Sequence, residues 1–104
     1  MRVIDVPTFM KEREAGEVDV VVDVRTEAEW SNGHVPGAVW LPLQELVDRV
    51  SELQPYRDQT LHLICQSGGR SGRAGQYLES LGYDVVNIMG GTGMWIALGN
   101  PVER

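Results

Sequence analysis

The chain lacks residues on which several classes of small protein depend. It contains a single cysteine, Cys65, and a single lysine, Lys11, among 104 residues, and its formal net charge is −6. One cysteine cannot form an intramolecular disulfide, and a structural zinc ion needs several such ligands. A surface that binds duplex nucleic acid needs clustered positive charge. These shortages exclude a disulfide-rich secreted scaffold and a structural zinc domain, and they argue against nucleic-acid binding.

Long apolar runs are also missing. No run approaches the roughly 20 residues of a membrane span, and the segment Met1–Asp5 does not lead into the apolar core of a signal peptide. We therefore expect a cytoplasmic protein that does not contact a membrane. Because globular domains typically contain roughly 100–150 residues, we expect residues 1–104 to form a single domain.

Charge is unevenly distributed along the chain. The first 55 residues carry five basic and eleven acidic side chains, whereas the remainder carries four of each. The segment Gln59–Leu78 contains Arg70 and Arg73 but no carboxylate. The sequence therefore predicts a locally positive stretch beside Cys65 in an acidic protein.

Apolar patterns predict strands that alternate with helices. The segment Val18–Val24 is nearly continuous and β-branched, which is typical of a strand covered on both faces. Shorter strands are predicted at 2–4, 38–41, 60–64 and 84–88, and helical spacing is found at 7–16, 43–50 and 74–81. This alternation predicts an α/β fold with a mainly parallel sheet and helices on both faces. Ligands of such folds bind at the carboxyl ends of the strands.

The segment Cys65–Ser71 lies where such a ligand would bind, between a predicted strand and a predicted helix. Gly68 and Gly69 allow the backbone to curl, so that successive N–H groups converge on one point. The helix that follows adds its unpaired N–H groups, and Ser71 is expected to be its N-cap. A thiol in such surroundings ionises readily and becomes a nucleophile.

Three interpretations of Cys65 compete. A lone cysteine is most often a small buried apolar residue, but the neighbouring glycines and arginine argue against that. A redox sensor would need a resolving cysteine, which the chain does not contain. Nucleophilic attack on an anionic substrate remains. Only four residues separate Cys65 from Arg70, whereas cysteine-dependent phosphatases have five there, so the tighter ring favours a sulfur anion over a phosphate.

Together, five segments make the chain resemble a single-domain rhodanese, of the sulfurtransferase family. The matching segments are Val22–Trp30, Gly33–Ala38, Cys65–Ser71, Gly90–Trp95 and Gly99–Glu103. The resemblance implies a rhodanese-like α/β fold with a central five-stranded, mainly parallel sheet. It also implies a two-step reaction, in which Cys65 takes sulfur from a donor as a persulfide and passes it to a nucleophilic acceptor.

The resemblance also assigns residues to the reaction. Cys65 would carry the sulfur, and the substrate-binding cradle would consist of Gln66, Ser67, Gly68, Gly69, Arg70 and Ser71. Donor hydrogen bonds in such a cradle stabilise an anionic persulfide. Asp23 and Arg25 lie at the same edge, where they are expected to form a supporting ion pair or hydrogen bond or, alternatively, to contact the substrate directly. Arg73 would either steer anionic donors or be an ordinary surface residue.

The expected partners are small. Thiosulfate or a persulfide would be the donor, and cyanide or a small-molecule or protein thiol would be the acceptor, with no metal, cofactor, nucleic acid or membrane involved. Two alternatives remain open. One is a non-catalytic rhodanese-like interaction or regulatory domain, and the other is a phosphatase or arsenate reductase on the same fold.

Overall fold

The computed structural model describes residues 1–104 and contains one five-stranded sheet. Its strands are β1 (Arg2–Asp5), β2 (Val20–Asp23), β3 (Val39–Trp40), β4 (Thr60–Ile64) and β5 (Asp84–Met89). They pair in the order β1-β5-β4-β2-β3, and every pairing between neighbouring strands is parallel. The prediction of a parallel α/β fold is confirmed.

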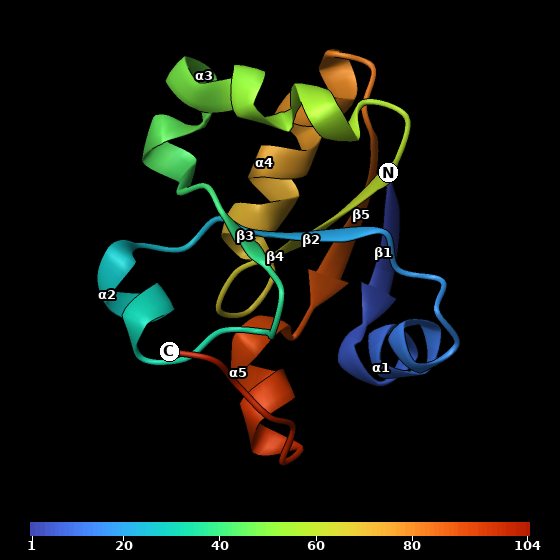
Figure 1. Cartoon of the computed structure of the whole chain (residues 1–104), viewed down its shortest axis with the longest axis vertical. Helices are drawn as coiled ribbons and strands as arrows, with labels where there is room; N and C mark the ends of the chain where they lie inside the picture. The colour runs from blue at the N-terminus through green and yellow to red at the C-terminus, as the bar shows by residue number, and fades with distance from the viewer.

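Helices cover both faces of this sheet (Figure 1). The α-helices are α1 (Val6–Glu14), α2 (Glu27–Ser31), α3 (Leu46–Arg49), α4 (Gly69–Ser80) and α5 (Gly91–Ala97). Helices α1 and α5 lie on one side of the sheet, and α3 and α4 lie on the other. None of these helices combines the length and the hydropathy that crossing a lipid bilayer requires.

The two faces of the sheet bury two separate apolar cores. On the side of α3 and α4, Leu46 and Leu78 pack with Val22 of β2. On the other side, Phe9 of α1 and Trp95 of α5 pack with Val21. Successive strand residues point to opposite faces, so the β-branched run in β2 supplies both cores. The central strands are thereby held rigidly between two helical layers.

The prediction of one continuous helix at 43–50 is confirmed only in part. This part of the chain forms a 3₁₀ turn at Leu43–Glu45, the short helix α3, and a second 3₁₀ segment at Val50–Tyr56. The broken path leaves Val47 66% exposed, while Leu46 and Leu53 are buried. Leu43 and Val50 are partly buried and pack against the same core, so the apolar spacing reflects core contacts made from successive helical turns rather than from one continuous α-helix.

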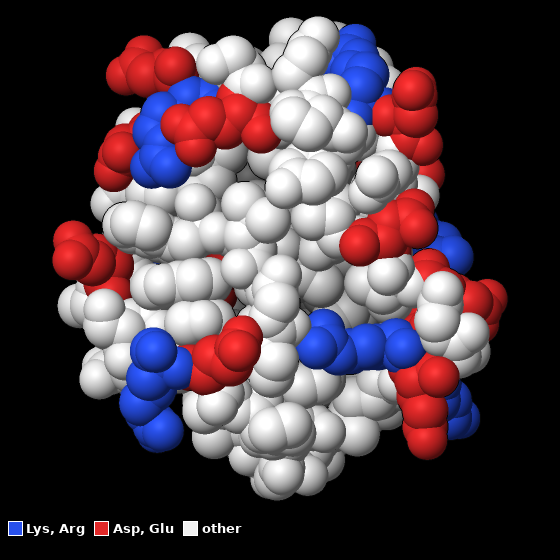
Figure 2. All heavy atoms as spheres, viewed as in Figure 1, with Lys and Arg blue, Asp and Glu red and all other residues white.

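The carboxyl ends of the three central strands lie at one edge of the sheet. There, β2 ends at Asp23, β4 at Ile64 and β5 at Met89. The amide of Val24 donates to the carbonyl of Ile64, which holds the first two ends together. On the face shown in Figure 2, basic groups lie beside acidic groups around the rim and the middle is uncharged. That face offers no extended basic patch.

Candidate active site

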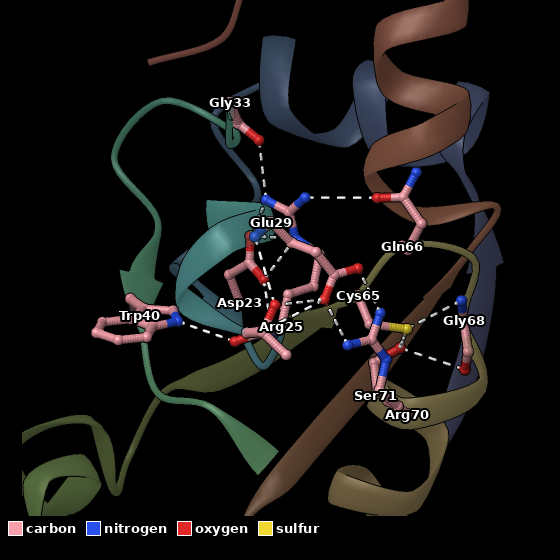
Figure 3. A network of polar contacts seen from close by, with 11 residues as sticks. Asp23, Arg25, Glu29, Gly33, Trp40, Cys65, Gln66, Gly68, Arg70 and Ser71 are labelled. Carbon is pink, nitrogen blue, oxygen red and sulfur yellow. Dashed lines mark hydrogen bonds and ion pairs between the residues drawn. The ribbon is translucent and has the colours of Figure 1, made fainter. Parts of the chain in front are cut away.

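Cys65 follows directly after β4 and lies under the loop that leads into α4 (Figure 3). Its side chain is buried, with 1% of the residue exposed. The amide of Gly68 donates to the sulfur at 3.1 Å, and the Ser71 hydroxyl oxygen lies 3.3 Å from it. Gly68 has φ +120°, a conformation that favours glycine, and it turns its amide back toward the thiol.

The surroundings of Cys65 favour its ionised form. Burial alone would raise the pKa of the Cys65 thiol, but hydrogen bonds from the Ser71 hydroxyl and from the amides of Ser71, Gly68 and Ser67 outweigh burial and hold the pKa below its ordinary value. A thiol with a lowered pKa is a thiolate over a wider pH range, and the thiolate is the nucleophile. The loop therefore has the chemistry of a nucleophilic site.

The segment that enters α5 holds the carbonyl groups of this loop. The amides of Gly90, Thr92 and Gly93 donate to the carbonyls of Ser67, Cys65 and Gln66 at 2.9, 2.9 and 3.1 Å, respectively. These hydrogen bonds hold the three carbonyls toward the start of α5, and the sulfur accepts the Gly68 amide on its own side of the loop.

Gly91 makes this close approach of α5 feasible. It has φ +57°, and a Cβ at this position would overlap the carbonyl oxygen of Cys65. Only glycine fits such a conformation at such a distance from another backbone. The Gly90–Gly91 pair in the sequence thus reflects a contact with the loop that begins at Cys65.

The expectation that Ser71 is the N-cap of the helix is wrong. Helix α4 already begins at Gly69, and its N-cap is Gly68. Ser71 lies inside the first turn, is fully buried, and directs its hydroxyl toward Cys65 and toward Asn87 of β5. The two glycines allow the helix to start early, so that the serine faces the thiol rather than a free backbone amide.

Arg70 points to a carboxylate from another part of the chain. Its guanidinium forms two hydrogen bonds of 2.7 Å with the two carboxylate oxygens of Glu29 in α2. The Arg70 hydrogen bond lowers the pKa of Glu29 to about 2, and the same contact raises the pKa of Arg70. The positive stretch expected from the local sequence is therefore largely neutralised by Glu29.

Glu29→Gln is expected to lower the free energy of unfolding at neutral pH but not at strongly acidic pH. The folded pKa of Glu29 lies below its ordinary value of 4.5, so its contribution is present above about pH 4.5 and is lost as the pH falls toward 2. At pH 7 the variant should lose about 1 kcal/mol or less, because the pair is partly exposed. Urea unfolding at pH 7 and pH 3 measures this difference. Glu27→Gln, which removes an exposed and unpaired carboxylate, is the control; a loss of equal size at both pH values would contradict the assignment.

Asp23 and Arg25 form a buried ion pair behind the loop. The Arg25 Nη2 and Asp23 Oδ2 atoms are 2.8 Å apart, and both side chains are almost completely buried. Arg25 also donates to the carbonyl of Gly33 at 2.9 Å and to the side-chain oxygen of Gln66 at 3.4 Å. Through Gln66, the pair connects the end of β2 to the start of the loop.

The remaining predicted residues lie at the surface. Gly69 and Arg73 are exposed, and Arg73 forms no ion pair. Sequence reasoning missed Glu29 and Asn87 as neighbours of the loop. Glu29 lies within a segment used only for the family resemblance. Asn87 lies in a predicted strand, and nothing in the sequence indicated that its polar side chain is buried beside the loop. No group of three His, Cys, Asp or Glu side chains is arranged to hold a metal ion.

Comparison with known protein families shows to which family the chain belongs. The sequence model of the rhodanese-like domain matches residues 5–98. The chain belongs to the rhodanese-like family. Among rhodanese-like relatives, a sulfurtransferase of Allochromatium vinosum is 39% identical over 95 residues, covering 89% of this chain and 87% of the relative. A thiosulfate sulfurtransferase of Escherichia coli is 34% identical over 70 residues, covering 67% of each chain.

A solved structure shares the rhodanese-like fold over the whole length. The rhodanese-related protein of Thermoplasma volcanium superposes with a TM-score of 0.87 and is 31% identical, covering 99% of this chain and 98% of that protein. The resemblance inferred from the five sequence segments is thereby confirmed. The rhodanese-like chain is similar to proteins named sulfurtransferases, and its loop has the geometry described above.

Proposed function

We propose that this rhodanese-like protein transfers a sulfane sulfur from a donor to a nucleophilic acceptor through a persulfide on Cys65. The observation that carries the proposal is the thiol itself: it is the only cysteine of the chain, it is buried under the loop, and it accepts the Gly68 amide at 3.1 Å. Relatives named sulfurtransferases support the same reaction class.

The reaction would proceed in two displacements. The Cys65 thiolate attacks the outer sulfur of the donor, a bond forms between the two sulfur atoms, and the bond from that sulfur to the rest of the donor breaks with its electron pair. Sulfite leaves when the donor is thiosulfate, and a thiolate leaves when it is a persulfide. The acceptor, cyanide or a thiol, then attacks the outer sulfur and Cys65 departs as a thiolate.

The loop would stabilise the charged species along this path. We assign the amides from Gln66 to Arg70 to binding the anionic persulfide, because fixed donors stabilise developing charge without reorganisation. Ser71, whose hydroxyl lies 3.3 Å from the sulfur, would stabilise the free thiolate before it attacks the donor. Asp23, Arg25 and the Arg70–Glu29 pair would hold the loop in shape rather than bind the donor, since each charge already has a partner. Arg73 is the cation left to attract an anionic donor.

The donor class follows from this pairing of charges. Thiosulfate is a dianion, and the E. coli relative is named for it. Arg70, the loop's only arginine, is engaged by Glu29, however. We therefore propose that organic persulfides, in which the group around the transferred sulfur carries a single negative charge, are donors alongside thiosulfate. The acceptor is a small-molecule or protein thiol from outside the chain, because the chain has no second cysteine. A cytoplasmic location remains a prediction.

Intact-protein mass spectrometry tests the proposal. After incubation with thiosulfate or glutathione persulfide, the protein should gain the mass of one sulfur atom and lose it again on addition of cyanide or a dithiol. Protein alkylated beforehand with iodoacetamide is the control, because only one thiol is available for alkylation. A protein that takes up no sulfur from either donor, and whose thiol titrates like free cysteine, would instead be a non-catalytic interaction domain. Cys65-dependent hydrolysis of an aryl phosphate would favour a phosphatase.

A further inference from the structure

One buried hydroxyl beneath the loop has more acceptors than it has protons. The Ser71 Oγ atom lies 3.3 Å from the sulfur of Cys65, 2.5 Å from Oδ1 of Asn87 and 3.2 Å from the carbonyl oxygen of Gly68. Figure 3 shows its contacts with Cys65 and Gly68. A serine hydroxyl carries one proton and can donate to only one of these groups at a time. The direction of this proton therefore depends on which acceptor is strongest.

The orientation of the Asn87 amide is fixed by its other contact. Asn87 lies on β5 and is 4% exposed. Its Nδ2 donates to the carbonyl oxygen of Gly68 at 3.1 Å. Since that oxygen can only accept, the amide nitrogen faces Gly68 and Oδ1 faces Ser71. Two oxygen atoms 2.5 Å apart need a proton between them. While the sulfur of Cys65 is uncharged, the Ser71 proton therefore points to Asn87.

Ionisation of Cys65 reverses this preference. A thiolate accepts charge-assisted hydrogen bonds, which are stronger than those to a neutral amide. The Ser71 O–H then rotates toward the sulfur without any change in its covalent bonds, and the proton released by Cys65 goes to solvent. The Oδ1 atom of Asn87 loses its only donor and stays buried, which is unfavourable. Asn87 thus opposes the rotation that stabilises the thiolate.

We infer that Asn87 is a positioning residue that competes with the sulfur of Cys65 for the Ser71 hydroxyl proton. The inference deepens the proposed function and rests on it for its role in sulfur transfer. In a persulfide, the negative charge lies on the outer sulfur and the inner sulfur is uncharged, so the Ser71 proton returns to Asn87. Asn87 thereby stabilises the sulfur-loaded form relative to the free thiolate.

Substituting Asn87 by leucine leaves the charged groups around the loop unchanged. Arg70 is paired with Glu29 of α2, and Arg25 is paired with Asp23 of β2. Helix α5 carries no charged side chain. Substituting Asn87 by leucine changes no charge, and the Gly68 carbonyl keeps the Gly72 amide as a donor at 3.1 Å. A change in the acidity of Cys65 then reports on the hydroxyl.

The pH profile of Cys65 alkylation by iodoacetamide tests the inference. Asn87→Leu should lower the midpoint by about half to one pH unit, because the Ser71 proton loses its nearest competing acceptor and only the Gly68 carbonyl at 3.2 Å remains. Ser71→Ala should raise the midpoint. The double variant Ser71→Ala, Asn87→Leu should have the same midpoint as Ser71→Ala alone, because no hydroxyl proton is left to redirect. A residue that only maintained the loop would raise the midpoint when removed. A midpoint that is unchanged or raised in Asn87→Leu would overturn the inference.

A measurement on the unsubstituted protein covers the case in which Asn87→Leu does not fold. The side-chain carbonyl of Asn87, followed by ¹³C NMR, should titrate with the same midpoint as Cys65, and this titration should vanish in Ser71→Ala. A carbonyl signal that ignores the ionisation of Cys65 would contradict the inference. Neither measurement uses a sulfur donor, so their outcome is independent of whether the protein takes up sulfur.

Discussion

Cys65→Ser is expected to abolish sulfur uptake completely while leaving the protein folded. A serine hydroxyl does not ionise at accessible pH and cannot form a persulfide, so no mass should be added by any donor. Because serine is nearly the same size as cysteine and the Gly68 amide still finds an acceptor, the urea midpoint should stay close to that of the unsubstituted chain. Intact mass spectrometry measures the first effect, and urea unfolding measures the second.

The control for this substitution moves the thiol instead of removing it. In the double variant Cys65→Ser, Ser51→Cys, the only thiol lies at an exposed position remote in sequence from the loop. That thiol lacks the amides that lower the pKa of Cys65, so it should not be loaded by thiosulfate under conditions that load the unsubstituted protein. Equal loading of the relocated thiol would show that the loop has no part in the reaction.

Arg25→Met is expected to be the most destabilising single change outside the cores. It leaves the Asp23 carboxylate in a site where that residue is 0% exposed, with only the backbone amide of residue 25 as a donor. Removing one partner of a buried ion pair typically costs about 3–5 kcal/mol. That is a large part of the roughly 5–15 kcal/mol by which a domain is stable. Urea midpoints of the purified proteins measure the loss.

Two further variants separate the buried charge from the loss of an arginine in general. Adding Asp23→Leu to Arg25→Met removes the unpaired charge and should restore much of the stability, since well-packed apolar residues can replace a buried pair. Arg49→Met removes an arginine that pairs with Glu45 and Glu52 at the surface and should cost no more than about 1 kcal/mol. If Arg25→Met proved as mild as Arg49→Met, the pair would not be a structural element.

The fold was predictable because its signals are local. The β-branched run that contains β2 and the glycines after α1 and α4 mark elements whose boundaries depend on neighbouring residues. The segment 43–50 shows where this reasoning fails. Its apolar residues have helical spacing, but Leu46 is buried while Val47 faces solvent, and the buried Leu53 lies beyond the segment in the following 3₁₀ turns. Tertiary packing decided between one helix and three turns, and spacing alone does not contain that information.

The candidate site was predictable in its centre and not in its surroundings. Cys65 and the following glycines form one continuous segment, so their chemistry can be read from the sequence. The groups that modify it come from α2, β5 and α5, and their proximity depends on the strand order. Counting charge along the chain predicted a positive loop, whereas Glu29 neutralises Arg70. Asn87 is one residue in an apolar strand until the pairing of β5 beside β4 brings it to Ser71.

The amides that restrain the loop carbonyls have a consequence for how the chain is made. Gly90, Thr92 and Gly93 are synthesised after Cys65, and chains emerge from the ribosome with their N-terminal part first. Until these residues have joined the fold, the carbonyls of Cys65, Gln66 and Ser67 lack the donors that hold them in the finished loop. The acidity that the folded loop gives to the Cys65 thiol therefore depends on residues 90–93, which the ribosome adds some 25 residues after the cysteine.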